Sequence, residues 1–262
     1  MMKPGNYKLI LKIFFRIYML YLTMTLFFVY GHSLLKLAHH GIGSAYFMNS
    51  FFLFPLAVAG VAYDSVQRGL IGKPRVRFKN HGSIMLTAML VTILLNVVFH
   101  MLDSIYSVPD FLENYRSLRN QPLFILSAVL IAPVAEEIIF RGVITRDLLR
   151  YHSEKTTILI SGLLFGLIHV NPAQILPAIF AGFFLAWLYI RTNNLGLCIF
   201  LHVANNAMAV VMMWVFPDDV LPMTRLHSFL ILCISVFLMG YFLFQLRRGI
   251  STSVSDRFSG FN

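Results

Sequence analysis

The stretch Gln121–Thr145, QPLFILSAVLIAPVAEEIIFRGVIT, is apolar enough to cross a bilayer as a helix, yet it contains three charged side chains. About 20 mostly apolar residues are needed to span the hydrocarbon core. The charges are the adjacent Glu136 and Glu137 and, four residues later, Arg141. An ionisable group at this depth costs about 2.5–3.5 kcal/mol on insertion scales, so each needs a partner or a function. The stretch indicates a membrane helix that carries a polar site.

The composition of the whole chain agrees with a membrane protein. Of its 262 residues, 58% are hydrophobic and 12% are charged, and the mean hydropathy is +0.75. Soluble domains are about 45–50% apolar and about 25% charged. This excludes a soluble domain and a disordered chain, and we expect no nucleic-acid partner. The two cysteines, Cys198 and Cys233, fall in apolar stretches and are expected to be packed as small hydrophobic residues.

Eight apolar stretches are candidate membrane spans. They predict an all-α, polytopic membrane helix bundle that forms a single integral membrane domain over residues 1–262. The fifth stretch is short and is expected to gain length from Tyr151–Thr156. The expected spans are 10–30, 46–63, 83–102, 121–145, 157–170, 174–190, 195–216 and 226–246.

The distribution of positive charge predicts the orientation of these spans. With the N-terminus inside, fourteen Lys and Arg residues fall in inner segments, four in outer segments and three within spans. Lys and Arg are enriched on the cytoplasmic side of membrane proteins. We therefore expect both termini to be cytoplasmic, and the basic loop 64–82 to contact anionic lipid.

The two adjacent glutamates are expected to differ in role. Glu137 and Arg141 are four residues apart, so they share one helix face and can form an ion pair. Glu136 is turned about 100° around the helix from Glu137, so Arg141 cannot easily serve both carboxylates. A surplus carboxylate in a low-dielectric site can accept and return a proton. We expect chemistry from Glu136 and a structural pair from Glu137 and Arg141.

Polar residues on two later spans fall at a similar depth. His169 closes the fifth span, and His202 and Asn206 lie four residues apart on one face of the seventh. At about 1.5 Å per residue from the inner end of each helix, Glu136 and His169 lie about 20 Å deep, and His202 and Asn206 roughly 10–17 Å. We therefore expect these four residues to line one cavity that opens inward.

Two further patterns are expected to be structural. Asn96 and His100 also lie four residues apart, but His100 is about 25 Å above the inner end of its helix, towards the outer face. Gly162 and Gly166 form a small-xxx-small pattern, which lets a neighbouring helix approach closely.

Three motifs follow one another on successive apolar helices. They are Glu136-Glu137-x-x-x-Arg141, Phe165-x-x-x-His169 and His202-x-x-x-Asn206. In residue identity and order they resemble the motifs of the CAAX-processing and bacteriocin-processing (CPBP, or Abi) intramembrane glutamic proteases. The resemblance covers about residues 121–210, a third of the chain, and is greater to the bacterial members.

The resemblance implies an endopeptidase that hydrolyses membrane-embedded or lipid-anchored proteins or peptides, in a polar cavity of a multi-pass protein of the bacterial plasma membrane. By position, Glu136 would be the general base and His169 would orient or polarise the water. His202 and Asn206 would stabilise the oxyanion. The supporting residues would be Glu137, Arg141 and Phe165.

The sequence leaves three alternatives open. Glu136, His169 and His202 are also a possible zinc ligand set, and zinc-bound hydroxide would perform the same hydrolysis. The resemblance favours a glutamate mechanism without a metal or other cofactor, whose activity survives chelation. The chain is alternatively a non-catalytic scaffold or immunity protein of the same fold. A transporter is less well supported, because no inverted repeat is found.

Overall fold

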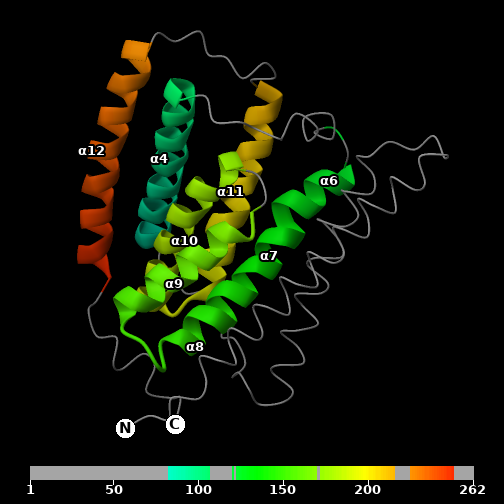
Figure 1. The fold of residues 1–262 in the computed structure, drawn as a ribbon, viewed down its shortest axis with the longest axis vertical. Helices are drawn as coiled ribbons and strands as arrows, with labels where there is room; N and C mark the ends of the chain where they lie inside the picture. Colours follow the sequence, from blue (N-terminus) through cyan, green and yellow to red (C-terminus); the bar gives the residue numbers. More distant parts are fainter. Residues whose placement is uncertain (1–81, 107–119, 121, 170–171, 216–224, 251–262) are drawn as a thin grey trace, which may run out of the picture.

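The computed structural model describes residues 82–106, 120, 122–169, 172–215 and 225–250, and every regular element in these ranges is a helix (Figure 1). The elements are α4 (Gly82–Tyr106), α6 (Pro122–Leu126), η2 (Ser127–Ile131), α7 (Ala132–Glu137), η3 (Ile138–Thr145), α8 (Arg146–Leu148), α9 (Glu154–Leu167), α10 (Pro172–Thr192), α11 (Leu195–Val215) and α12 (Arg225–Gly249). The expected all-α, polytopic membrane architecture is confirmed.

Four of the predicted spans match helices that are long and apolar enough to cross a membrane. Within the described ranges these segments are Gly82–Leu102, Gln174–Thr192, Leu195–Met212 and Leu226–Arg248. The expected spans 10–30 and 46–63, the basic loop 64–82 and both chain ends lie outside the described residues. The count of eight spans, the cytoplasmic termini and the single domain therefore stay predictions.

The helix that carries the two glutamates runs from Pro122 to Leu148 and changes twice from α to π geometry. In a π segment each backbone N–H bonds to the carbonyl five residues earlier, and such segments are frequent at functional sites. The six residues of α7 lie between the two π segments, η2 and η3, and both glutamates are on α7. The helix ends at Leu148, slightly beyond the expected span of 121–145.

The next helix, α9, is shorter than expected. Its N-cap is Ser153, whose side chain accepts a hydrogen bond from the backbone N–H of Thr156 at 3.3 Å. This capping starts the helix at Glu154, so the second half of the expected extension over Tyr151–Thr156 is helical and the first half is not. The helix ends at Leu167, and His169 lies just beyond its end.

Glycines allow α9 and α10 to pack closely. A Cβ atom on Gly162 would lie 2.8 Å from the backbone nitrogen of Phe183, and one on Gly182 would lie 2.8 Å from the Cα of Gly162. Any larger residue at this crossing would push the helices apart. A Cβ on Gly166 would likewise lie 2.9 Å from the carbonyl oxygen of Ile175. The expected close approach at Gly162 and Gly166 is confirmed.

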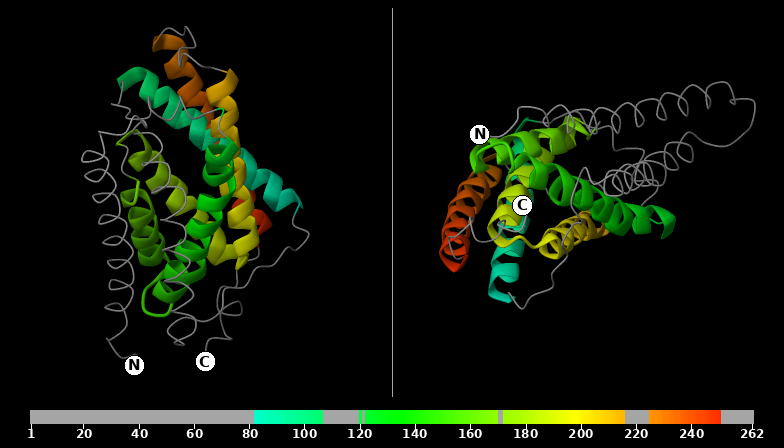
Figure 2. Two further views of the ribbon diagram at one scale, coloured as in Figure 1. Left: turned by 90° about the vertical axis from the view of Figure 1, so that its right-hand side faces the viewer. Right: turned by 90° about the horizontal axis from the view of Figure 1, so that it is seen from below.

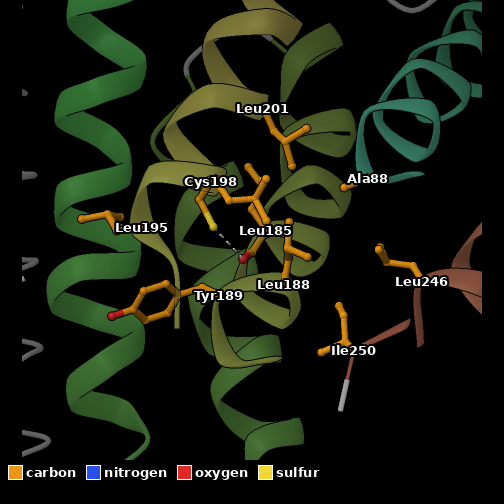
Figure 3. Close-up of a cluster of buried hydrophobic side chains, with 10 residues drawn as sticks. Ala88, Leu185, Leu188, Tyr189, Leu195, Cys198, Leu201, Leu246 and Ile250 are labelled. Carbon is orange, nitrogen blue, oxygen red and sulfur yellow. Dashed lines mark hydrogen bonds between the residues drawn. The ribbon is translucent and has the colours of Figure 1, made fainter. Parts of the chain in front are cut away.

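A second region of the core joins the long helices. α12 packs along α4, which crosses the bundle obliquely (Figure 2). The four helices α4, α10, α11 and α12 enclose a cluster of buried apolar side chains (Figure 3). Cys198 belongs to it, with its thiol 3.7 Å from the carbonyl oxygen of Leu185. Cys233 is exposed on α12, which corrects the expectation of a packed side chain, because a membrane helix can direct apolar residues towards lipid.

Candidate active site

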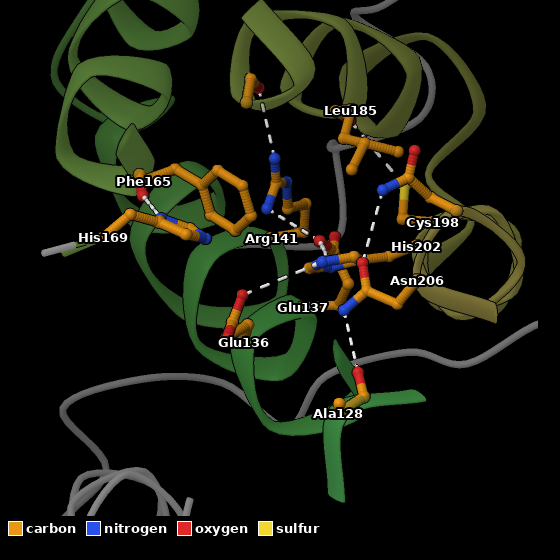
Figure 4. A network of polar contacts seen from close by, with 12 residues as sticks. Ala128, Glu136, Glu137, Arg141, Phe165, His169, Leu185, Cys198, His202 and Asn206 are labelled. Carbon is orange, nitrogen blue, oxygen red and sulfur yellow. Dashed lines mark hydrogen bonds and ion pairs between the residues drawn. The ribbon is translucent and has the colours of Figure 1, made fainter. Parts of the chain in front are cut away.

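One cavity of about 260 Å³ is lined by Glu136, His169, His202 and Asn206. These residues come from α7, from the segment after α9 and from α11, and Figure 4 shows them converging. The structure therefore places the four residues singled out from the sequence around one space.

Glu137 is part of a buried ion pair. Its Oε1 accepts a hydrogen bond from the Nη1 of Arg141 at 2.8 Å, and both side chains are 0% exposed. The Nη2 of Arg141 donates to the carbonyl oxygen of Gly182 at 3.2 Å. The guanidinium also lies over the ring of Phe165, 4.5 Å from the centroid. The pair expected from the i, i+4 spacing is present, and it links α7 and η3 to the glycine crossing of α9 and α10.

His202 lies between the two glutamates. Its Nδ1 is 2.9 Å from the Oε1 of Glu137, and its Nε2 is 3.8 Å from the Oε2 of Glu136. A carboxylate can only accept, so Nδ1 carries the proton and donates it to Glu137. Arg141 and Glu137 therefore hold the imidazole of His202 with its Nε2 directed towards Glu136. This contact between the first and third motifs was not foreseen from the sequence.

His169 is oriented by its own motif. Its Nδ1 is 2.9 Å from the carbonyl oxygen of Phe165, which can only accept, so the Nδ1 of His169 donates this bond. In the neutral ring the Nε2 is then an acceptor. The ring of Phe165 packs against His169 and His202, with centroid separations of 5.4 and 5.6 Å. Phe165 thus supports both imidazoles and the guanidinium of Arg141.

Glu136 differs from Glu137 in its surroundings. Its side chain is 13% exposed and lines the cavity. Among the described residues, its Oε2 has no hydrogen-bond partner; this oxygen is buried and lies 3.8 Å from the Nε2 of His202. A carboxylate that lines a cavity can take a proton from a bound molecule.

Two asparagines that the sequence reasoning did not assign to the site also line the cavity. Asn96, on α4, donates from its Nδ2 to the Oδ1 of Asn205 at 2.6 Å. Asn206 donates to the carbonyl oxygen of Ala128 at 2.8 Å (Figure 4). Asn96 was expected to be structural, like His100, but it lines the cavity, which corrects that expectation; His100 is exposed and does not line the cavity. The amide side chains of Asn96 and Asn205 could have indicated a place at the site, because polar side chains within membrane spans tend to face the bundle interior.

The described residues do not contain a formed metal site. Over these ranges, no group of three or more His, Cys, Asp or Glu side chains is arranged to hold a metal ion. In this geometry a metal ion could not be held by the set considered for zinc, which is Glu136, His169 and His202.

Comparison with known proteins relates this site to a family. Residues 118–208, which include all three motifs, match the family model described as "Type II CAAX prenyl endopeptidase Rce1-like". This segment is Rce1-like. The resemblance to the CAAX-processing family is thereby confirmed for the segment.

A curated relative supports the same assignment of the Rce1-like segment. The chain is 37% identical over 95 residues to "Putative membrane peptidase YdiL" of Bacillus subtilis (strain 168). The alignment covers 35% of this chain and 37% of that protein, so the chain spans little more than a third of the length of this relative. No solved structure matches the chain.

Proposed function

We propose that this protein is a CAAX-protease-like membrane endopeptidase, in which Glu136 activates water to hydrolyse peptide bonds of membrane-embedded or lipid-anchored proteins or peptides. The Rce1-like segment and the similarity to a protein named as a membrane peptidase support a peptidase. The observation that carries the glutamate mechanism is the difference between the two carboxylates. Glu137 is fully buried and ion-paired, whereas the side chain of Glu136 is 13% exposed, lines the cavity and has one oxygen without a hydrogen-bond partner among the described residues.

In the first step the carboxylate of Glu136 takes a proton from water, and the water oxygen bonds to the carbonyl carbon of the substrate. The Nε2 of His169 is an acceptor, so it can take a hydrogen bond from the other hydrogen of this water and orient it. The carbonyl π electrons move to oxygen and form a tetrahedral oxyanion.

The oxyanion is stabilised by donors on α11. Asn206 uses one hydrogen of its Nδ2 for the carbonyl of Ala128, and the second is available. If His202 carries a proton on both ring nitrogens, it donates from Nδ1 to Glu137 and can donate from Nε2 to the oxyanion. In a serine protease, removal of one oxyanion donor costs about 10²–10³ in kcat.

In the last step the oxyanion collapses and the C–N bond breaks. Glu136 returns its proton to the leaving nitrogen, which departs as an amine, and the other product is a new carboxyl terminus. The carboxylate of Glu136 is regenerated. Glu137 and Arg141 hold His202 and do not exchange protons with the substrate.

This mechanism uses no metal or other cofactor. We further propose that the protein acts as a multi-pass protein of a bacterial plasma membrane, with lipids as neighbours and no nucleic-acid partner. The apolar helices support the membrane setting, and the similarity to a Bacillus subtilis protein supports the bacterial one.

A comparison of protein termini in cells tests the peptidase. Cells expressing the wild type, Glu136→Gln or Glu154→Gln would be compared by mass spectrometry of N- and C-terminal peptides of membrane and secreted proteins. Glu154→Gln is a matched control, because Glu154, at the start of α9, pairs with Arg191 at 3.0 Å and does not line the cavity. We expect specific termini to disappear only in Glu136→Gln. Identical termini in all three strains, with a phenotype that persists in Glu136→Gln, would favour the non-catalytic scaffold.

A further inference from the structure

The carbonyl of Ala128 lacks its usual backbone donor. In the π segment η2 the N–H of Ala132 bonds to the carbonyl oxygen of Ser127, five residues earlier. The next bond in this register would run from residue 133 to Ala128, but residue 133 is proline and has no N–H. The donor that reaches this carbonyl is the Nδ2 of Asn206, at 2.8 Å. Pro133 and the π register therefore leave an acceptor that the side chain of Asn206 uses.

Three asparagine side chains form a continuous chain of hydrogen bonds that ends at this carbonyl. Asn96 donates to the backbone carbonyl of Thr92 at 2.8 Å and to the Oδ1 of Asn205 at 2.6 Å. The Nδ2 of Asn205 donates to the Oδ1 of Asn206 at 3.3 Å. This series of hydrogen bonds thus begins on α4, passes along α11 and ends on η2.

The two ends of this series of hydrogen bonds determine the orientation of every side-chain amide in it. Both ends are backbone carbonyls, which can only accept, so Asn96 and Asn206 must each direct their NH₂ group outward. The Oδ1 of Asn206 then needs a donor, which Asn205 provides, and the Oδ1 of Asn205 needs a donor, which Asn96 provides. A flipped Asn206 would place its own carbonyl oxygen against that of Ala128. The second N–H of Asn206 is consequently kept available to the cavity.

We propose that Asn96, Asn205 and the carbonyl of Ala128 freed by Pro133 are a positioning device that keeps the Asn206 amide turned as a donor towards the reacting carbonyl. This inference rests on the proposed function for its effect on rate. The device itself is a property of the folded protein and can be observed without activity. Asn96 and Asn205 act through Asn206 and are positioning residues, and Asn206 is the residue that contacts the oxyanion.

The first test is kinetic and uses purified protein in liposomes with a peptide that the wild type cleaves. Asn205→Leu removes the donor to Asn206, and we expect about a tenfold fall in kcat, the equivalent of one buried hydrogen bond, with KM unchanged. In an Asn206→Ala background the same substitution is expected to have no further effect, because neighbouring residues that act through one group are not additive. A purely structural role would lower the rate of both backgrounds equally and would overturn the proposal.

Pro133→Ala tests the role of the Ala128 carbonyl by giving it a competing backbone donor. Alanine restores an N–H that can bond to Ala128 and compete with Asn206, so we expect kcat to fall about 2- to 10-fold. Removal of a proline from a helix interior should leave the protein as stable as the wild type or more stable. Gln245→Leu removes an amide on α12, away from the cavity lining, and should leave kcat unchanged. An unchanged kcat in Pro133→Ala would contradict the proposal.

A spectroscopic measurement separates this proposal from the proposed function. In protein labelled with ¹⁵N-asparagine, the side-chain amide of Asn206 should give two proton signals of clearly different shift, because one hydrogen is bonded to Ala128 and the other is not. Both Asn205→Leu and Pro133→Ala should shift these signals, and Gln245→Leu should not. If the signals respond but the wild type cleaves nothing, the proposed function is wrong and the positioning device stands. If they do not respond, the device is wrong whatever the activity.

Discussion

A single methyl group at the crossing of α9 and α10 should disturb the buried ion pair. In Gly162→Ala the new Cβ would lie 2.8 Å from the backbone nitrogen of Phe183, whereas ordinary contacts begin at 3.4 Å, so the helices must separate locally by about 0.6 Å. The carbonyl of Gly182, on the same face of α10, is now 3.2 Å from the Nη2 of Arg141. A displacement of that size away from Arg141 would lengthen this contact to about 3.8 Å, beyond hydrogen-bond range.

Three contributions determine the expected loss of stability. Forcing one extra methyl into a tight contact costs about 1–3 kcal/mol. Loss of a hydrogen bond from a charged donor costs about 1.5–3 kcal/mol. Replacing glycine by alanine within a helix returns about 1 kcal/mol. The free energy of unfolding of Gly162→Ala should therefore fall by about 1.5–5 kcal/mol.

Reversible unfolding in detergent micelles, followed by circular dichroism, measures this difference. The matched control is Gly240→Ala on α12, where a Cβ would meet nothing within 4 Å. We expect the control to be as stable as the wild type or about 1 kcal/mol more stable. If Gly162→Ala unfolds at the same denaturant concentration as Gly240→Ala, the close crossing does not support the ion pair and this reasoning fails.

Three further predictions concern the ion pair, the metal and pH. Arg141→Met would leave the carboxylate of Glu137 buried without its cation, and the free energy of unfolding should fall by about 3–5 kcal/mol in the same assay; unchanged stability would show that the pair does not matter. Peptidase activity should persist after exhaustive treatment with EDTA and phenanthroline, whereas a loss that zinc restores would establish a metal mechanism. In α8, beyond the apolar stretch, burial raises the pKa of Asp147 above its ordinary value of 3.8, although Arg150 opposes the shift. The folded protein then holds this proton more tightly than the unfolded chain, so stability relative to Asp147→Asn should fall as pH rises above that value; a difference that does not vary with pH would contradict this.

Features that depend on spacing within one helix could be predicted from the sequence. The Glu137–Arg141 pair follows from an i, i+4 separation in an apolar stretch, and it is present at 2.8 Å. Counting residues from the inner ends of helices placed Glu136 at about 20 Å and His202 with Asn206 at roughly 10–17 Å, and the side chains of Glu136 and His202 lie 3.8 Å apart. Depth can be counted because the rise per residue of a helix is nearly constant.

Features that depend on how helices are rotated against each other could not be predicted. The contact of His202 with Glu137 depends on how α11 is rotated against α7, which lies between two π segments. Asn96 was expected to be structural, whereas it lines the cavity and donates a hydrogen bond to Asn205 on another helix. The exposure of Cys233 likewise depends on which face of α12 meets other helices.

The release of the Ala128 carbonyl shows what local sequence does contain. Pro133 is visible in the sequence, and the absence of its N–H guarantees one unpaired carbonyl in the preceding turn. Which carbonyl is left depends on the helix register, and only the structure shows that the register is π and that Asn206 provides the donor. A proline in a sequence can thus indicate that a carbonyl needs another donor, whereas the tertiary structure determines which group provides it.

The most direct test of the account is hydrolysis in H₂¹⁸O by the purified protein in liposomes, with peptides that cover a cleavage site found in cells. The wild type should produce a new carboxyl terminus that contains one ¹⁸O atom, and Glu136→Gln, folded as judged by circular dichroism, should produce none. Equal incorporation by the two proteins would show that Glu136 does not activate the water and would contradict the central claim.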